Sequence, residues 1–148
     1  MDLILWRHAD AEEGRDDLAR RLTPKGSKQA ERMAAWLEAH LPKEARVVVS
    51  PAVRAQQTAK CLKRDLKTSE ALAPGVGAAA LLEACGWPHG KGTIVAVGHQ
   101  PTLGSAAALA LTGKPARWEM KKGAIWWIAA REGESAPRVV AVLSPDFL

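Results

Sequence analysis

The chain opens with Leu3-Ile4-Leu5-Trp6-Arg7-His8, a short apolar run that ends in an arginine and a histidine. An apolar run without alternation is typical of a strand that is covered on both faces, as strands are in α/β sheets. Two more such runs follow, at 46–50 and 93–98. Arg54 comes shortly after the second run, and His99 comes directly after the third. The three runs predict the centre of a parallel sheet.

The polar residues that follow these runs predict one site. In an open α/β sheet, ligands bind outside the carboxyl ends of the strands, so these residues should meet at one edge. Guanidinium forks, here Arg7 and Arg54, match the oxygens of a phosphoryl group in transfer. An unprotonated histidine nitrogen can attack phosphorus and form an intermediate that water hydrolyses, and His99 can add a hydrogen bond to the same oxygens. The pattern predicts a site for a doubly charged anion with a histidine nucleophile.

The segments around these runs complete an α/β fold. We expect strands at 2–7, 46–50 and 93–98, a weak strand near 69–72, and a final hairpin of 124–130 and 139–143. We expect helices over 24–40, with Thr23 as the cap, and over 51–66, 75–86 and 101–111, and a loop from 10 to 21. This order predicts a single domain, residues 1–148, built as a three-layer α/β/α sandwich. Its central sheet should be mostly parallel, with an antiparallel edge.

Composition narrows the class of partner. The 148 residues carry a formal net charge of +5, which suits an anionic partner, yet they contain no compact basic stripe or nucleic-acid-binding motif. No apolar stretch reaches the roughly 20 residues that span a bilayer, and the start lacks the pattern of a signal peptide. Cys61 and Cys85 have no metal-ligand spacing and predict free thiols. We expect a cytoplasmic protein that needs no metal or cofactor and binds neither nucleic acid nor membrane.

Four segments resemble the histidine phosphatase superfamily, whose members have the phosphoglycerate mutase-like fold. Arg7-His8-Ala9 resembles its Arg-His-Gly signature, with alanine in place of the glycine. Residues 22–30, 50–59 and 97–101 are similar to its Leu-Thr-x-x-Gly-x-x-Gln-Ala segment, its Ser-Pro-x-x-Arg-Ala-x-Gln-Thr-Ala segment and its second-histidine segment. The resemblance covers residues 1–112 in the family's order.

The resemblance implies a role for each residue of the site. His8 becomes the phosphorylated nucleophile, and its catalytic partners Arg7, Arg54 and His99 form the phosphate pocket. Arg21, which precedes the Leu-Thr segment, is implied as a further substrate-binding arginine. The small size and the Arg-His-Ala form are most similar to the SixA-type phosphohistidine phosphatases.

The chain departs from the family in its proton donor. Many members carry a carboxylic acid after the second arginine, which protonates the leaving oxygen, but residues 71–77 contain no carboxylate. Glu70, Glu83 and Asp10 remain as candidate donors. General acid catalysis matters most for a poor leaving group such as an alkoxide. An imidazole leaves phosphorus far more easily, so a pocket without a dedicated acid favours phosphohistidine.

We therefore expect a metal-independent phosphatase that acts on phosphohistidine in a protein. One alternative is a phosphatase of the same superfamily that acts on a small phosphorylated molecule. A phosphomutase is a second alternative, although it needs an acid and a closed site. A non-catalytic phosphate-binding module is a third, and it has no need of a nucleophile such as His8.

Overall fold

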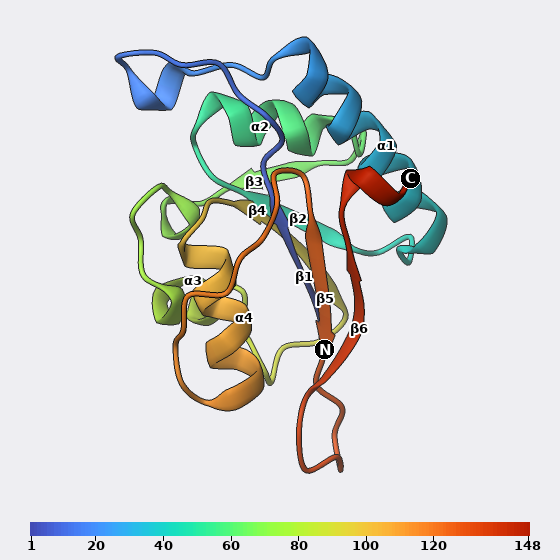
Figure 1. Ribbon diagram of the computed structural model, residues 1–148. Helices are drawn as coiled ribbons and strands as arrows, with labels where there is room; N and C mark the ends of the chain where they lie inside the picture. Colours follow the sequence, from blue (N-terminus) through green and yellow to red (C-terminus); the bar gives the residue numbers. More distant parts are fainter.

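The computed structural model describes residues 1–148 and consists of one six-stranded sheet with helices on both faces (Figure 1). The strands are β1 (Asp2–Arg7), β2 (Arg46–Val49), β3 (Leu66–Thr68), β4 (Thr93–Gly98), β5 (Ile125–Ala129) and β6 (Arg138–Leu143). Their order in the sheet is β3-β2-β4-β1-β5-β6. The pairs among β3, β2, β4 and β1 are parallel, whereas β5 and β6 join antiparallel. The predicted three-layer sandwich with an antiparallel edge is confirmed.

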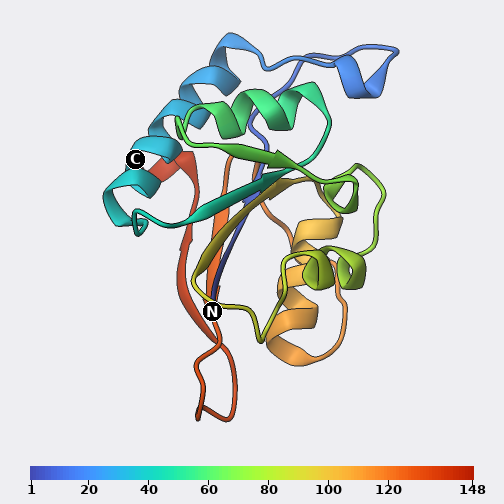
Figure 2. The ribbon, with the colours of Figure 1, turned by 180° about the vertical axis from the view of Figure 1, so that it is seen from behind.

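Four helices cover the sheet, two on each face, as the two opposite views show (Figures 1 and 2). Helices α1 (Pro24–His40) and α2 (Val53–Lys60) lie on one face, and α3 (Ala78–Ala84) and α4 (Thr102–Thr112) lie on the other. Three single 3-10 turns are η1 (Asp17–Ala19), η2 (Glu70–Leu72) and η3 (Pro145–Phe147). None of the helices has both the length and the apolar character of a membrane span.

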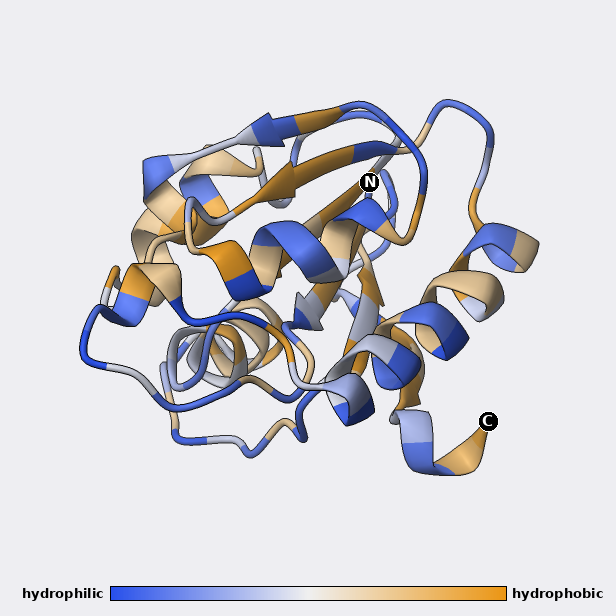
Figure 3. Ribbon diagram, turned by 90° about the horizontal axis from the view of Figure 1, so that it is seen from above, coloured by the Kyte–Doolittle hydropathy of each residue, from blue (hydrophilic) through white to orange (hydrophobic).

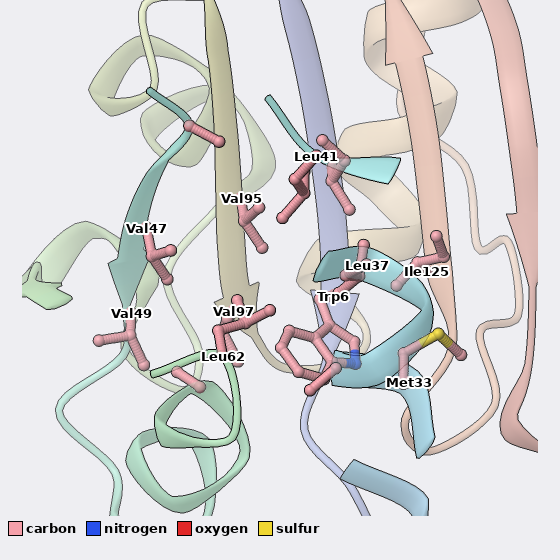
Figure 4. Packing of buried hydrophobic residues seen from close by; sticks show 14 of the residues in the cluster. Trp6, Met33, Leu37, Leu41, Val47, Val49, Leu62, Val95, Val97 and Ile125 are labelled. Carbon is pink, nitrogen blue, oxygen red and sulfur yellow. The ribbon is translucent and has the colours of Figure 1, made fainter. Parts of the chain in front are cut away.

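The alternation of each buried strand divides the core into two halves. Ile4 and Trp6 of β1 face α1 and α2, where they pack in the cluster that Figure 4 shows. Leu3 and Leu5 face the other pair of helices. Coloured by hydropathy, the strands are mostly apolar and the outer helix surfaces carry most of the hydrophilic residues (Figure 3). A strand that buries both faces has no place for polar residues along its length. The polar side chains of the site therefore lie at the ends of the strands.

The predicted boundaries of three elements were wrong. The helix expected over 51–66 ends at Lys60, and Lys63 has a positive φ of 54°, which interrupts helical geometry. The weak strand expected at 69–72 lies earlier, at Leu66–Thr68, because the Ser69 hydroxyl caps a 3-10 turn over 70–72 instead. The helix expected over 75–86 is limited to α3, since Gly75 has a φ of +84°. These changes leave the order of the elements intact.

The parallel register brings the ends of three strands together. Arg7 of β1 pairs with Gly98 of β4, and Val49 of β2 pairs with Val97 of β4. The next residues, His8, Ser50 and His99, therefore leave the sheet side by side at its carboxyl edge.

Candidate active site

His8 is buried, and both of its ring nitrogens have a defined partner. Nδ1 lies 2.7 Å from the carbonyl oxygen of Ala9. Nε2 lies 3.3 Å from Nε of Arg54. A carbonyl oxygen can only accept a hydrogen bond and a guanidinium can only donate one. The proton of neutral His8 therefore sits on Nδ1, and the lone pair of Nε2 points toward Arg54.

The surroundings of His8 keep the ring uncharged. Burial first, and then the positive charges of Arg54, Arg7 and Arg20, lower its pKa to about 4 against the opposing effect of the hydrogen bond to the Ala9 carbonyl. At neutral pH Nε2 of the imidazole is therefore unprotonated, as a nucleophile must be.

His99 lies beside His8, with 5.1 Å between the ring centroids. Its Nε2 is 2.7 Å from Oγ of Ser50, and that hydroxyl oxygen accepts a hydrogen bond from the backbone N–H of Ala52. Burial, the neighbouring His8 and Arg54 lower the pKa of His99 to about 3. The other nitrogen, Nδ1, is buried and has no partner in the protein. It can bond an oxygen of a substrate.

Arg7 is held by the segment that precedes β5. Its Nη1 donates to the carbonyl of Met120 over 2.7 Å. The same segment bonds the residues on either side of Arg7: the Trp6 indole donates to the Gly123 carbonyl, and the Gly123 N–H donates to the His8 carbonyl. Nε of Arg7 is buried without a partner, so Arg7 and His99 each hold one buried nitrogen that no protein group bonds.

Arg54 begins the first turn of α2, and its side chain is 5% exposed. Besides the contact to His8, Nη1 donates to the backbone carbonyl of Asp17 over 2.6 Å. Nη2 donates to the Asp17 carboxylate over 3.1 Å. The structure thus brings Arg7, His8, Arg54 and His99 together, and it adds Asp17, which the sequence reasoning missed. An aspartate in a polar loop without periodicity carries no signal that would single it out.

The arginine that the loop turns toward the site is Arg20. Its Nη1 lies 3.0 Å from the Asp17 carboxylate, and its charge contributes to the lowered pKa of His8. Arg21 is exposed and its side chain makes no hydrogen bond or ion pair, although its backbone carbonyl accepts from Glu12. The role of Arg21 in binding substrate stays a prediction.

None of the three candidate acids forms a hydrogen bond or ion pair with Arg7, His8, Arg54 or His99. Glu70 and Glu83 are exposed and form no hydrogen bond or ion pair through their side chains. The Asp10 carboxylate accepts hydrogen bonds from Lys122 over 2.8 Å and from Thr23 over 2.8 Å. The bond from Lys122 has the largest effect on the pKa of Asp10, and both bonds lower it. Asp10 is therefore an ionised structural group.

A hollow of about 410 Å³ lies at the start of α4, and none of Arg7, His8, Arg54 and His99 lines it. It lies between residues 75–78, the start of α4 from Pro101, and residues 115–117. Arg117 is the one charged residue in its wall. No group of three His, Cys, Asp or Glu side chains is arranged to hold a metal ion.

Comparisons with known proteins agree with this geometry. The sequence model of the histidine phosphatase superfamily (branch 1) matches residues 3–75. A phosphohistidine phosphatase SixA homolog of Haemophilus influenzae is 44% identical over 64 residues, a stretch that spans 39% of this chain and 39% of that protein.

Solved structures share the fold over nearly the whole chain. The protein histidine phosphatase SixA, solved with tungstate, superposes with a TM-score of 0.85 at 23% identity, over 99% of each chain. A phosphoserine phosphatase of Entamoeba histolytica, solved with 3-phosphoglyceric acid, gives a TM-score of 0.73 at 19% identity, over 97% of this chain and 96% of that one. Residues 3–75 thus match the histidine phosphatase superfamily, and the chain has the phosphoglycerate mutase-like fold and is similar to the SixA-type members.

Proposed function

We propose that this protein is a phosphohistidine phosphatase that works without a metal, through a phosphoryl intermediate on Nε2 of His8. The observation that carries the proposal is the fixed tautomer of His8, with its proton bonded to the Ala9 carbonyl and its lone pair toward Arg54. The unpaired N–H groups of Arg7 and His99 support it, because buried donors without acceptors are costly unless they serve an anion.

The reaction has two steps. In the first, Nε2 of His8 attacks phosphorus, the new N–P bond forms, and the N–P bond of the substrate breaks, while the departing imidazole nitrogen takes up a proton from solvent. In the second, water attacks the phosphoryl group and gives up a proton to solvent, the bond to His8 breaks with its electron pair returning to Nε2, and inorganic phosphate leaves. Arg7, Arg54 and His99 donate to the phosphoryl oxygens in both transition states, which is preorganised electrostatic stabilisation.

The leaving group decides between substrate classes. None of Glu70, Glu83 and Asp10 bonds a residue of the site, and Asp10 is held as an anion by Lys122 and Thr23, whereas a phosphohistidine needs no strong acid. A SixA homolog is named for phosphohistidine phosphatase activity, which supports the same class. We propose that the phosphohistidine is carried by a protein.

The hollow at the start of α4, whose wall includes Pro101 two residues after His99, favours a second candidate. At about 410 Å³ it can receive the body of a small phosphorylated molecule. Such a phosphomonoesterase would use the same nucleophile and the same anion donors, and would differ only in requiring a proton donor for its leaving oxygen.

The test is a side-by-side assay of hydrolysis of a phosphohistidine peptide and of p-nitrophenyl phosphate, with EDTA present. We expect rapid loss of phosphohistidine, weak ester hydrolysis and no effect of EDTA. The matched variants are His8→Ala, which should abolish turnover with an unchanged fold, and His89→Ala, which replaces an exposed histidine and should be neutral.

The other outcomes separate the alternatives. Fast ester hydrolysis with slow loss of phosphohistidine identifies the phosphomonoesterase. Normal turnover by His8→Ala, or a strict metal requirement, contradicts the mechanism. Phosphate binding without turnover on either substrate indicates a binding module.

A further inference from the structure

The carboxylate of Asp17 holds the two arginines at the mouth of the site. Its Oδ1 lies 3.0 Å from Nη1 of Arg20, and its Oδ2 lies 3.1 Å from Nη2 of Arg54. Both views show the loop that carries Asp17 extending beyond the amino end of α2, where Arg54 lies (Figures 1 and 2). One anion therefore bridges two guanidinium groups next to the nucleophile.

This is the arrangement that a phosphoryl group requires. Carboxylates and phosphates bind a guanidinium through the same charge-assisted hydrogen bonds. The guanidinium of Arg54 has five N–H groups, and three of them are engaged: that of Nε with His8, one of Nη1 with the Asp17 carbonyl and one of Nη2 with the Asp17 carboxylate. A phosphoryl oxygen that bonds the same N–H of Nη2 must displace the carboxylate.

The exposure of Asp17 to water allows a substrate to displace its carboxylate. Its side chain is 54% exposed, whereas that of Arg54 is 5% exposed. The carboxylate can therefore leave into water, which solvates it well, while Arg54 stays in place. The bonds to Arg20 and then Arg54 hold the pKa of Asp17 below its usual value, so it is an anion at neutral pH.

We infer that Asp17 is an internal competitor for the phosphate pocket: it occupies Arg54 until a phosphorylated substrate takes its place. This inference rests on the proposed function only in that a phosphoryl group binds at Arg54. Because the pocket is competent only in the molecules where Arg54 is released, the apparent affinity for any anion falls by that fraction. Inorganic phosphate, which has no other contacts to offer, is bound weakly, and the product leaves easily.

The opposite role for Asp17 would be to position Arg54. Positioning is already supplied by the backbone, because the Asp17 carbonyl accepts from Nη1 over 2.6 Å and does not depend on the side chain. The carboxylate adds a charge. Replacing it with a neutral amide therefore separates competition from positioning.

The experiment is a titration of the full chain with inorganic phosphate by calorimetry. For Asp17→Asn we expect phosphate to bind roughly fivefold more tightly, the factor that corresponds to a partly exposed ion pair. Asp16→Asn is the matched control, because it removes the same charge from the neighbouring residue, which forms no ion pair. Asp16→Asn should change the affinity much less.

A second pair of variants locates the effect at Arg54. In an Arg54→Ala background, Asp17→Asn should no longer tighten phosphate binding, since the carboxylate then has nothing to compete for there. Unchanged or weaker phosphate binding by Asp17→Asn overturns the inference and leaves the proposed function standing. Equal gains for Asp16→Asn and Asp17→Asn overturn it as well, because the effect is then one of net charge. Failure of every variant and of the unmodified chain to bind phosphate contradicts both the inference and the proposed function.

Discussion

The hydroxyl of Ser50 lies 2.7 Å from Nε2 of His99 and thereby joins the end of β2 to the end of β4. Its oxygen accepts from the Ala52 N–H, and its proton is free to bond the imidazole. A hydroxyl that donates to Nε2 places the proton of neutral His99 on Nδ1, the nitrogen without a partner. Ser50 therefore sets which atom His99 offers to the substrate.

Replacing Ser50 tests this assignment. We expect Ser50→Ala to lower kcat/KM by about tenfold, which corresponds to the loss of one hydrogen bond that orients a donor. Ser69→Ala is the control, because the Ser69 hydroxyl likewise accepts from the backbone N–H two residues later but lies at the 3-10 turn η2. Steady-state kinetics on a phosphohistidine peptide measure the effect. Equal values of kcat/KM for the two variants would show that Ser50 does not act through His99.

Arg54 should contribute more than any single neutral donor. Loss of a preorganised donor costs about 2.7–4 kcal/mol of transition-state stabilisation, so we expect Arg54→Ala to lower kcat by roughly 10²–10³-fold. Arg64→Ala removes an arginine that pairs with Glu38 instead and should leave kcat near that of the unmodified chain. An Arg54→Ala variant with nearly full activity would refute the arginine clamp.

The buried histidines predict a pH-dependent stability. The pKa of His8 is lowered to about 4 and that of His99 to about 3, so the unfolded chain binds protons first as the pH falls below the usual value near 6.5. Their contribution to the free energy of unfolding is complete above about pH 6.5 and is lost as the pH falls toward 4.

Denaturant unfolding at pH 7.5, 6 and 5 measures this loss. We expect stability to fall over that range, and the fall to be smaller for His99→Gln, which removes one titrating group. His40→Gln replaces an exposed histidine and serves as the control. A pH dependence that is the same for both variants would contradict burial of His99 as its cause.

A side chain added at Gly26 of α1 should cause a packing defect close to the site. A Cβ at this position would overlap the carbonyl oxygen of Asp10, two residues after His8. We expect Gly26→Ala to destabilise the protein by about 1–3 kcal/mol, as overpacking does, and to lower activity. Gly77→Ala is the matched control, since its Cβ would meet nothing within 4 Å. Thermal unfolding compares the two, and similar midpoints would show that α1 can move away without cost.

The sequence predicted the order of the strands and the meeting of Arg7, His8, Arg54 and His99 at one edge of the sheet, for a physical reason. Buried parallel strands are apolar along their whole length, so Arg7 and His99 stand out where the runs stop. The end of α2 was less predictable, because Leu62 continues the apolar spacing past Lys60. Only the backbone at Lys63 shows that the helix has ended.

The neighbouring arginines at 20 and 21 show a second limit of prediction from the sequence. Arg20 and Arg21 have the same chemistry, and only the direction of each side chain decides which one meets Asp17. The backbone is extended at Arg20 and a bridge between Ala11 and Leu22 follows closely. Neighbours on extended backbone point to opposite sides, so one arginine faces the site and the other faces water. That choice depends on contacts between segments, which no single stretch of sequence contains.

The bonds from Trp6, Arg7 and His8 to residues 120–123 have a consequence for protein engineering. Every charged residue of the site comes from the first two thirds of the chain, yet these bonds tie the end of β1 to the last third. A graft of residues 1–112 onto another scaffold would transfer the reactive groups without residues 120–123, whose hydrogen bonds hold the end of β1 in place. Such a chimera should bind anions weakly and turn over substrate slowly until equivalent hydrogen bonds are designed into it.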